Sequence, residues 1–320
     1  MANATNAAAF RGDLNTYVME AFSLPRFFIG DRVFPVYEVN VREGQYPKFQ
    51  IPAAQLQRDV ATERNLDGSY NEITRQFIRD TYSCVDRGLE ERVDDAYKAD
   101  FARYFDAERI AALQTLNNVR MKHEVRVAAQ LFAPTNFAAT SAVSAYTTAN
   151  LGNVDFVQDV QVQIENLNGS GVMPDTIVMS DSVANYVKRT TKFQNFAKPY
   201  GVTNTGGIPT DSVIQQAFAD LGIQNLLIGR ISRDSSKNRT TANLSKVWGN
   251  DYIWVGNIGS GDPFNGGAGR TFVWNEEGGV FVTETYRDEQ RRSDMVRVRQ
   301  HTAEKVIDTN AGRLIQTSFA

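Results

Sequence analysis

The amino-acid sequence predicts an α+β protein, and three observations carry this prediction. Hydrophobic residues recur at spacings of three and four between residues 106 and 132, which is typical of a long amphipathic helix. Alternation at period two predicts strands over residues 36–51 and again over residues 271–299. Short helices and strands alternate between these regions, over residues 156–255.

The composition is that of an ordinary globular protein. Of the 320 residues, 42% are hydrophobic and 22% are charged, and the net charge of −3 argues against a dedicated nucleic-acid binder. No apolar run has the length of a membrane span, and the first residues lack the features of a secretory signal, so we expect no membrane association. Cys84 is the only cysteine, which excludes an intrachain disulfide and fits a cytoplasmic history.

The first 75 residues predict segments that need another surface to lie on. Aromatic side chains crowd residues 22–34, and they either pack on their own domain or contact another subunit. Residues 33–75 are predicted to form an extended arm in which residues 36–41 pair with residues 46–51. An isolated hairpin is marginally stable in water, so this arm is expected to lie on a supporting surface.

Residues 84–132 are predicted to be the longest helical stretch. Its first half is strongly charged and is interpreted as a solvated face. Asp106 is the expected N-cap of a second helix, which Pro134 ends. Its apolar stripe comprises Leu116, Val119, His123, Val127 and Leu131. A helix of about 26 residues spans about 39 Å, which is long enough for a spine.

The middle of the chain predicts an α/β arrangement. In order, it contains a helix ending at Gly169, a strand at 175–179, a helix capped by Ser180, a helix from 209 to 222, and strands at 226–228 and 251–255. The glycine-rich residues 264–269 are predicted to be a flexible connection.

The last fifty residues return to β structure. Residues 271–274 and 280–286 are expected to pair as a hairpin, and alternation resumes at residues 295–299. Residues of both charge signs are concentrated between them, over residues 287–294. These charges form either a solvated turn, in which each ion pair contributes about 0 to 1 kcal/mol, or a self-complementary contact between symmetry-related subunits.

The sequence lacks the residue patterns of common catalytic and metal sites. Its only histidines are His123 and His301, and neither CxxC nor HExxH spacing occurs. The glycine-rich residues 256–261 lead into Asp262-Pro263 instead of a helix, so no nucleotide-binding loop is expected. We therefore expect no catalytic residue, no metal and no cofactor.

The order of elements and several motifs resemble the Hong Kong 97-like major capsid proteins of tailed bacteriophages, especially the phage-lambda-type major head proteins. The motifs are MPDTIVMS (173–180), VWGND (247–251), GRTFVW (269–274), YRDE (286–289), RSD (292–294) and DTNAGRLI (308–315). The resemblance implies a structural protein, not an enzyme, that forms hexamers and pentamers of an icosahedral shell around double-stranded DNA. It also implies location in the virion capsid and assembly in the host bacterial cytoplasm.

The resemblance implies a division of the chain into four parts. These are an N-terminal arm (1–32), an extended loop (33–75), a peripheral domain with the spine helix at about 106–132 (76–150 and 268–304), and an axial domain (151–267 and 305–320). Subunit contacts are expected at a peripheral loop formed by Arg287, Asp288, Glu289, Arg291, Arg292 and Asp294. Further contacts are expected from Tyr46, Lys48 and Phe49 of the extended loop and from Phe22, Phe27 and Phe28 of the arm.

The implied partners are further copies of the chain, together with scaffolding, portal and decoration proteins. Packaged DNA would be contacted without sequence specificity. Two alternatives stay open at this point. One is an encapsulin-like nanocompartment, which shares the fold but encloses cargo proteins. The other is a hydrolase whose site the sequence does not reveal.

Overall fold

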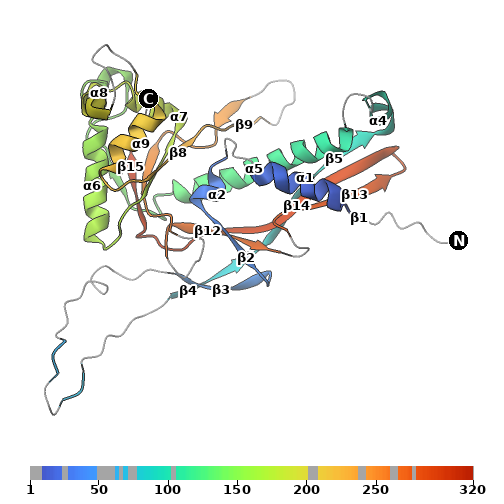
Figure 1. The fold of residues 1–320 in the computed structure, drawn as a ribbon, viewed down its shortest axis with the longest axis horizontal. Coiled ribbons are helices and arrows are strands. Elements are labelled where there is room, and N and C mark those ends of the chain that lie inside the picture. The colour runs from blue at the N-terminus through green and yellow to red at the C-terminus, as the bar shows by residue number, and fades with distance from the viewer. Residues whose placement is uncertain are drawn as a thin grey trace.

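The computed structural model describes residues 9–23, 28–48, 62–64, 68–70, 78–101, 106–200, 208–236, 243–259, 266–275 and 279–319. These residues form an elongated α+β molecule with two main sheets and a long helix along its axis, which confirms the predicted class (Figure 1). None of the described helices has the length and apolar character that a membrane span requires.

The larger sheet joins strands from both ends of the chain. Its order is β1 (Ala9–Phe10), β13 (Val282–Asp288), β14 (Ser293–Val306), β12 (Gly269–Trp274) and β2 (Val36–Val39), and β5 (Val85–Asp94) also pairs with β14. The expected hairpin between residues 271–274 and 280–286 is therefore wrong. Strand β14 is long enough to pair with β13 through its first half and with β12 through its second half.

Residues 85–94 form strand β5, whereas the sequence predicts a helix there. Val93 is buried beside the long helix, and Glu90 on the opposite face pairs with Arg297 of β14 at 2.6 Å. Because the period of two is carried mostly by charged side chains, hydrophobicity alone does not reveal it. The helical part of this stretch is α4 (Asp95–Phe101).

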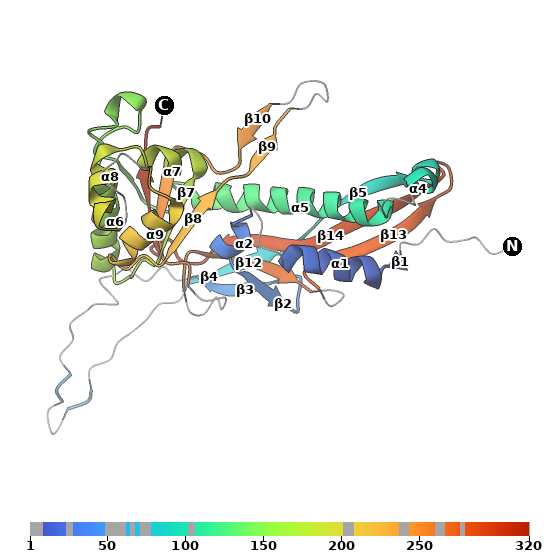
Figure 2. The same cartoon turned by 45° about the horizontal axis from the view of Figure 1, so that its top comes forward.

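The long helix α5 (Ala107–Leu131) forms as predicted. Its N-cap is Asp106, whose carboxylate accepts hydrogen bonds from the backbone N–H of Glu108 and Arg109. The predicted stripe from Leu116 to Leu131 is buried. Its first half packs on Val296 and Val298 of β14 and on helix α1 (Gly12–Ser23), which runs alongside it (Figure 2).

The smaller sheet carries the predicted α/β region. Its order is β6 (Ala139–Ser141), β15 (Gly312–Gln316), β11 (Tyr252–Gly256), β7 (Thr176–Ser180) and β8 (Asn225–Gly229). Helices α6 (Phe156–Gly169), α7 (Asp181–Val187), α8 (Thr191–Ala197) and α9 (Asp211–Ala219) surround it, and two short 3-10 helices lie at Thr148–Asn150 and Lys198–Tyr200. The predicted cap is confirmed, because the Ser180 hydroxyl accepts the N–H of Val183 at 3.3 Å.

Two ribbons extend from these sheets. Strand β3 (Glu43–Lys48) pairs with β4 (Ile78–Ser83), and β9 (Ser232–Asp234) pairs with β10 (Leu244–Lys246), which projects from the body (Figure 2). The expected pairing of residues 36–41 with 46–51 is wrong. Strand β2 instead joins the larger sheet in parallel with β12, which leaves β3 to pair with β4.

The described ends of the connection between the two sheets are held by a buried arginine. Arg270 is fully buried, and its guanidinium donates to the carbonyls of Ile258, Gly266 and Gly269 at 2.9, 2.6 and 2.7 Å. Gly267 has φ of +98°, and a Cβ there would lie 2.2 Å from the Ile258 carbonyl oxygen. The flexible connection predicted at 264–269 is thus pinned where the structure describes it; residues 264 and 265 lie outside the described part.

Candidate subunit-contact sites

The predicted charged run lies at the hairpin between β13 and β14, at the end of the larger sheet (Figure 2). Arg287 donates two hydrogen bonds of 2.6 Å to the carboxylate of Asp95 in α4. It also bonds Asp294 across the hairpin at 3.2 Å, and Lys98 of α4 reaches Asp294 at 3.1 Å. The hydrogen bonds from Arg287 lower the pKa of Asp95. The inner half of the run therefore fastens α4 to the hairpin within one subunit.

The outer half of the run faces solvent. The side chains of Glu289 and Arg291 are 72% and 65% exposed. Arg292 is also exposed, and its φ of +45° places it at the turn of the hairpin. Asp288 accepts two backbone N–H groups and shapes this turn. Of the six residues predicted here, Glu289, Arg291 and Arg292 are the ones whose charged groups remain most accessible to a neighbour.

Tyr46 anchors the β3–β4 ribbon to the larger sheet. It is 3% exposed, its ring lies 5.2 Å from that of Phe272 in β12, and its hydroxyl donates to Asp80 at 3.2 Å. Burial raises the pKa of the Tyr46 hydroxyl. Tyr82 stacks on the same Phe272 ring at 4.6 Å. The sequence predicts that Tyr46 faces a neighbour, but packing of this aromatic cluster buries it in its own subunit.

The other predicted arm and loop residues are distributed differently. Lys48 is half-buried and lies 3.7 Å from the carboxylate of Asp80, and Phe49 lies outside the described residues. Phe22 lies in α1, but its side chain is not described, and Phe27 lies outside the described residues. Phe28 is half-buried, with the guanidinium of Arg120 in α5 at 4.5 Å from its ring centre. Phe28 therefore packs on its own spine helix.

A buried carboxylate holds the segment after Phe28 against the spine helix. Glu124 of α5 accepts hydrogen bonds from the backbone N–H groups of Ile29 and Gly30 at 2.9 and 2.7 Å. It also accepts the indole N–H of Trp248 at 2.7 Å. Burial raises the pKa of Glu124. One side chain thus joins three distant parts of the chain.

His123, one residue earlier, bridges two carboxylates. Its Nε2 lies 3.3 Å from Asp31 of the short helix α2 (Gly30–Val33), and its Nδ1 lies 2.9 Å from Glu304 of β14. Burial opposes the charged form of the imidazole, but the two carboxylates outweigh it and raise the pKa of His123 to about 9. The sequence places His123 on the packed stripe; it contains no local signal for Asp31 or Glu304, which lie far away in the chain.

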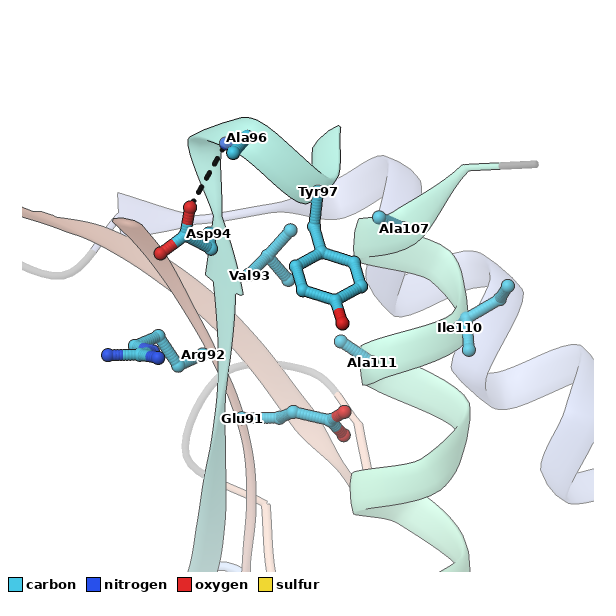
Figure 3. A pocket seen from close by; sticks show the side chains of 9 residues that line it. All are labelled: Glu91, Arg92, Val93, Asp94, Ala96, Tyr97, Ala107, Ile110 and Ala111. Carbon is cyan, nitrogen blue, oxygen red and sulfur yellow. Dashed lines mark hydrogen bonds between the residues drawn. The ribbon is translucent and has the colours of Figure 1, made fainter. Parts of the chain in front are cut away.

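An apolar groove of about 610 Å³ opens between β5, α4 and the first turns of α5 (Figure 3). Val93, Ala107 and Ala111 form its walls, and the ring of Tyr97 lies over them. Tyr97 and Ile110 are 65% and 37% exposed. Exposed apolar surface of this kind is typical of interaction sites. The sequence gives no local signal for this groove, because each of these residues is an isolated apolar position among charges.

The titratable side chains of the described residues do not gather into a metal site. In the part of the chain that the structure describes, no three histidine, cysteine, aspartate or glutamate side chains could hold a metal ion together. Cys84 is buried, and this burial raises the pKa of its thiol to about 11, so the thiol stays protonated at neutral pH. His301 lies in β14, where its ring packs 5.0 Å from that of Trp274.

Comparison with known proteins gives one relative in sequence. No family model matches the chain. The major capsid protein of Burkholderia phage BcepMu is 25% identical over 232 residues, which cover 71% of this chain and 70% of the relative.

Comparison with solved structures shows a shared fold over nearly the whole chain. A phage-related protein from Bordetella bronchiseptica RB50 is 20% identical, with a TM-score of 0.72 and coverage of 98% of each chain. A virus-like particle from Pyrococcus furiosus is 9% identical, with a TM-score of 0.54 and coverage of 96% of this chain and 97% of the other. The capsid of the cyanophage P-SCSP1u is 10% identical, with a TM-score of 0.54 and coverage of 93% of this chain and 90% of the other.

Proposed function

We propose that the chain, which has the Hong Kong 97-like fold of tailed-bacteriophage capsid proteins, is a major capsid protein that self-assembles into an icosahedral shell around phage DNA. The observation that carries this proposal is the agreement of two comparisons. The sequence relative is a phage major capsid protein, and the fold is shared with phage capsid proteins along more than nine-tenths of the chain.

The exposed surface of the subunit supports assembly on physical grounds. Several large apolar residues of the described part are exposed, among them Val41, Tyr97, Val143 and Met173 at 57%, 65%, 71% and 81%. Burying such side chains against neighbours is worth about 25 cal/mol for each Å² of apolar surface that is removed from water. An elongated subunit is therefore stabilised when neighbours cover its apolar parts.

The hairpin tip is assigned a role at the junctions between capsomers. In this assignment Arg287, Asp294 and Asp288 shape the tip, while Glu289, Arg291 and Arg292 meet opposite charges on symmetry-related copies. Such a contact is repeated at each symmetry axis, so a modest pairwise energy adds up over the shell. The exposure of the outer three residues supports this division of roles.

The extended loop and the arm are assigned contacts along the edges of neighbouring subunits. Lys48 is the last residue of β3, Phe49 follows it in the sequence, and Tyr46 serves as the anchor of the β3–β4 ribbon. Phe22 and Phe27 remain the arm residues proposed to contact a neighbour. The proposed domains keep their boundaries: the arm at 1–32, the loop at 33–75, a peripheral domain at 76–150 with 268–304, and an axial domain at 151–267 with 305–320.

The finer parts of the proposal concern activity, partners and location. We assign the chain no enzymatic activity. Its partners are other copies in hexamers and pentamers, scaffolding, portal and decoration proteins, and packaged DNA bound without sequence specificity. Assembly takes place in the host cytoplasm. An encapsulin-like compartment is not favoured, because the sequence relative is a phage major capsid protein. The described residues offer no observation that favours a hydrolase.

Sedimentation of the purified protein tests this proposal. We expect fast-sedimenting particles in equilibrium with subunits or capsomers, with the particle fraction rising with protein concentration. Negative-stain electron microscopy of the fast fraction should then show closed particles. A protein that sediments as a monomer at all concentrations, alone and with a co-expressed scaffolding protein, contradicts the proposal.

A further inference from the structure

A polar pocket of about 290 Å³ lies where β5 begins, against β14 and the spine helix α5. Arg87 of β5, Arg126 and Gln130 of α5, and Glu304 with Lys305 of β14 line it. The pocket is separate from the charged tip and from the apolar groove.

The carboxylate in this pocket is already occupied. One oxygen of Glu304, Oε1, accepts hydrogen bonds from His123 at 2.9 Å and from Arg126 at 2.9 and 2.8 Å. Arg87 approaches the other oxygen, Oε2, only to 3.9 Å. Burial opposes ionisation of Glu304, but the bonds from His123 and Arg126 lower its pKa, so it stays charged. A single negative charge therefore serves several cations.

Within the described residues, Arg87 and Lys305 are only weakly paired with carboxylates. The only hydrogen bond that Arg87 makes within the described residues is to the backbone carbonyl of Thr302, at 3.2 Å. Lys305 makes no ion pair within 4.0 Å with any residue that the structure describes; the carboxylate that interacts with it at longer range, Asp80, also pairs with Lys48 at 3.7 Å. Burial and the neighbouring positive charge of Arg126 lower the pKa of Arg87. Among the residues that line the pocket, the three cations Arg87, Arg126 and Lys305 thus outnumber the single carboxylate of Glu304.

The chain as a whole has the opposite balance. Its 37 acidic residues outnumber its 34 lysines and arginines, so a positive pocket is a local exception. In an assembly of identical copies, a positive pocket is complemented by acidic groups on the surface of another copy. A guanidinium presents parallel N–H donors that match the two oxygens of a carboxylate.

We propose that this pocket receives an aspartate or glutamate side chain from a second copy of the chain, with Arg87 as its main hydrogen-bond donor. This inference rests on the proposed shell function and adds to it a defined contact, away from the hairpin tip. The incoming carboxylate completes the charge balance around Arg87, Arg126 and Lys305. The contact between Arg87 and this carboxylate links the edge of the larger sheet in one subunit to the acidic surface of the next.

Charge reversal at Arg87 tests the contact. The Arg87→Glu variant places two carboxylates in the pocket, and Arg87→Gln removes the charge without adding one. The matched control is Lys122→Glu or Lys122→Gln, because Lys122 is an exposed residue of α5 outside the pocket. Circular dichroism and thermal unfolding of the dissociated subunits check that all four variants fold.

We expect Arg87→Gln to lower the yield of sedimentable shells about tenfold, the effect of about 1.4 kcal/mol per contact. Arg87→Glu should lower it further, and the Lys122 variants should assemble normally. If the Arg87 variants fold and form shells as the control does, the pocket inference is wrong while the shell proposal stands. If the unmodified protein forms no shells at all, the shell proposal itself fails.

Carbodiimide cross-linking identifies the partner directly, because it condenses an amine with an adjacent carboxylate. Shells of the unmodified protein and of the Arg87→Lys variant would be treated, digested and analysed by mass spectrometry. We expect an intersubunit cross-link from Lys305 or from the introduced amine to an aspartate or glutamate, in shells but not in dissociated subunits. An assembled shell without such a cross-link, together with inorganic phosphate binding that depends on Arg87, would instead identify a phosphate site and overturn the proposal.

Discussion

The carboxylate of Glu124 accepts a hydrogen bond of 2.7 Å from the indole nitrogen of Trp248, across more than 120 residues of sequence. The same carboxylate accepts the backbone N–H groups of Ile29 and Gly30. Trp248 lies in the buried cluster that joins the spine helix to the smaller sheet, together with Leu131 and Trp254. Glu124 therefore fixes the arm, the spine helix and the smaller sheet relative to one another.

Replacing Glu124 by glutamine is expected to destabilise the subunit. Both carboxylate oxygens act as acceptors, so the amide NH₂ of glutamine would face an N–H donor. Hydrogen bonds to charged groups contribute about 1.5 to 3 kcal/mol, and we expect a loss of about 2 kcal/mol in the free energy of unfolding. Urea denaturation of the dissociated subunit measures it. The control Glu165→Gln, on the exposed side of α6, should have little effect. Equal stability of the Glu124 variant and the unmodified protein would contradict this role.

The contacts of His123 with Asp31 and Glu304 predict that the free energy of unfolding falls at alkaline pH. The folded-state pKa of about 9 lies above the unfolded value near 6.5. The protonated imidazole therefore contributes its full stabilisation below pH about 6.5, and this contribution is lost as the pH rises through about 9. The full difference is of the order of 3 kcal/mol. Denaturation of His123→Gln and of the unmodified protein at pH 6, 8 and 10 separates this contribution, and parallel pH profiles would rule it out.

Charge reversal at the outer tip should block assembly without unfolding the subunit. The double variant Arg291→Glu, Arg292→Glu changes two exposed side chains. We therefore expect the free energy of unfolding of the subunit to change by less than about 0.5 kcal/mol. Shells should not form, because like charges would meet at the junction. Arg287→Glu is the contrast, since it breaks the 2.6 Å bonds to Asp95 inside the subunit. Normal shells from the double variant, seen by electron microscopy, would refute the junction role.

The apolar groove at β5 should matter for assembly more than for folding. Tyr97→Ser and Ile110→Ser remove partly exposed apolar surface, worth about 25 cal/mol for each Å² that a neighbour covers. We expect the free energy of unfolding to change little and the protein concentration needed for assembly to rise. Light scattering during assembly measures that concentration. An unchanged threshold in both variants would show that the groove stays uncovered in the shell.

The sequence predicts those parts of the fold that depend on local signals. The cap at Asp106, the stripe of α5 and the order from α6 through β7 to α7 follow from side chains within a few turns of one another. Strand pairing is different. The partner of β12 and β13 is β14, and the helical prediction for β5 failed because its charges pair with residues some 200 positions away.

The candidate contact sites show the same division. The charged run at 287–294 is visible in the sequence, and the structure places it at an exposed hairpin tip. Arg287 is held within the subunit by Asp95, whereas Arg291 stays exposed. No local sequence pattern connects Asp95 to the hairpin, so the sequence alone does not distinguish the two arginines. The sequence predicts that Tyr46 contacts a neighbouring subunit, because it does not show that Phe272 lies against the Tyr46 ring.

Electron cryomicroscopy of the assembled protein tests the central claim most directly. The chain would be expressed with and without a scaffolding protein, and the particles reconstructed at a resolution that traces the backbone. We expect closed icosahedral shells of hexamers and pentamers, with the hairpin tip of residues 287–294 at the junctions between capsomers. A folded protein that stays monomeric under every condition, or an open assembly without icosahedral symmetry, would contradict it.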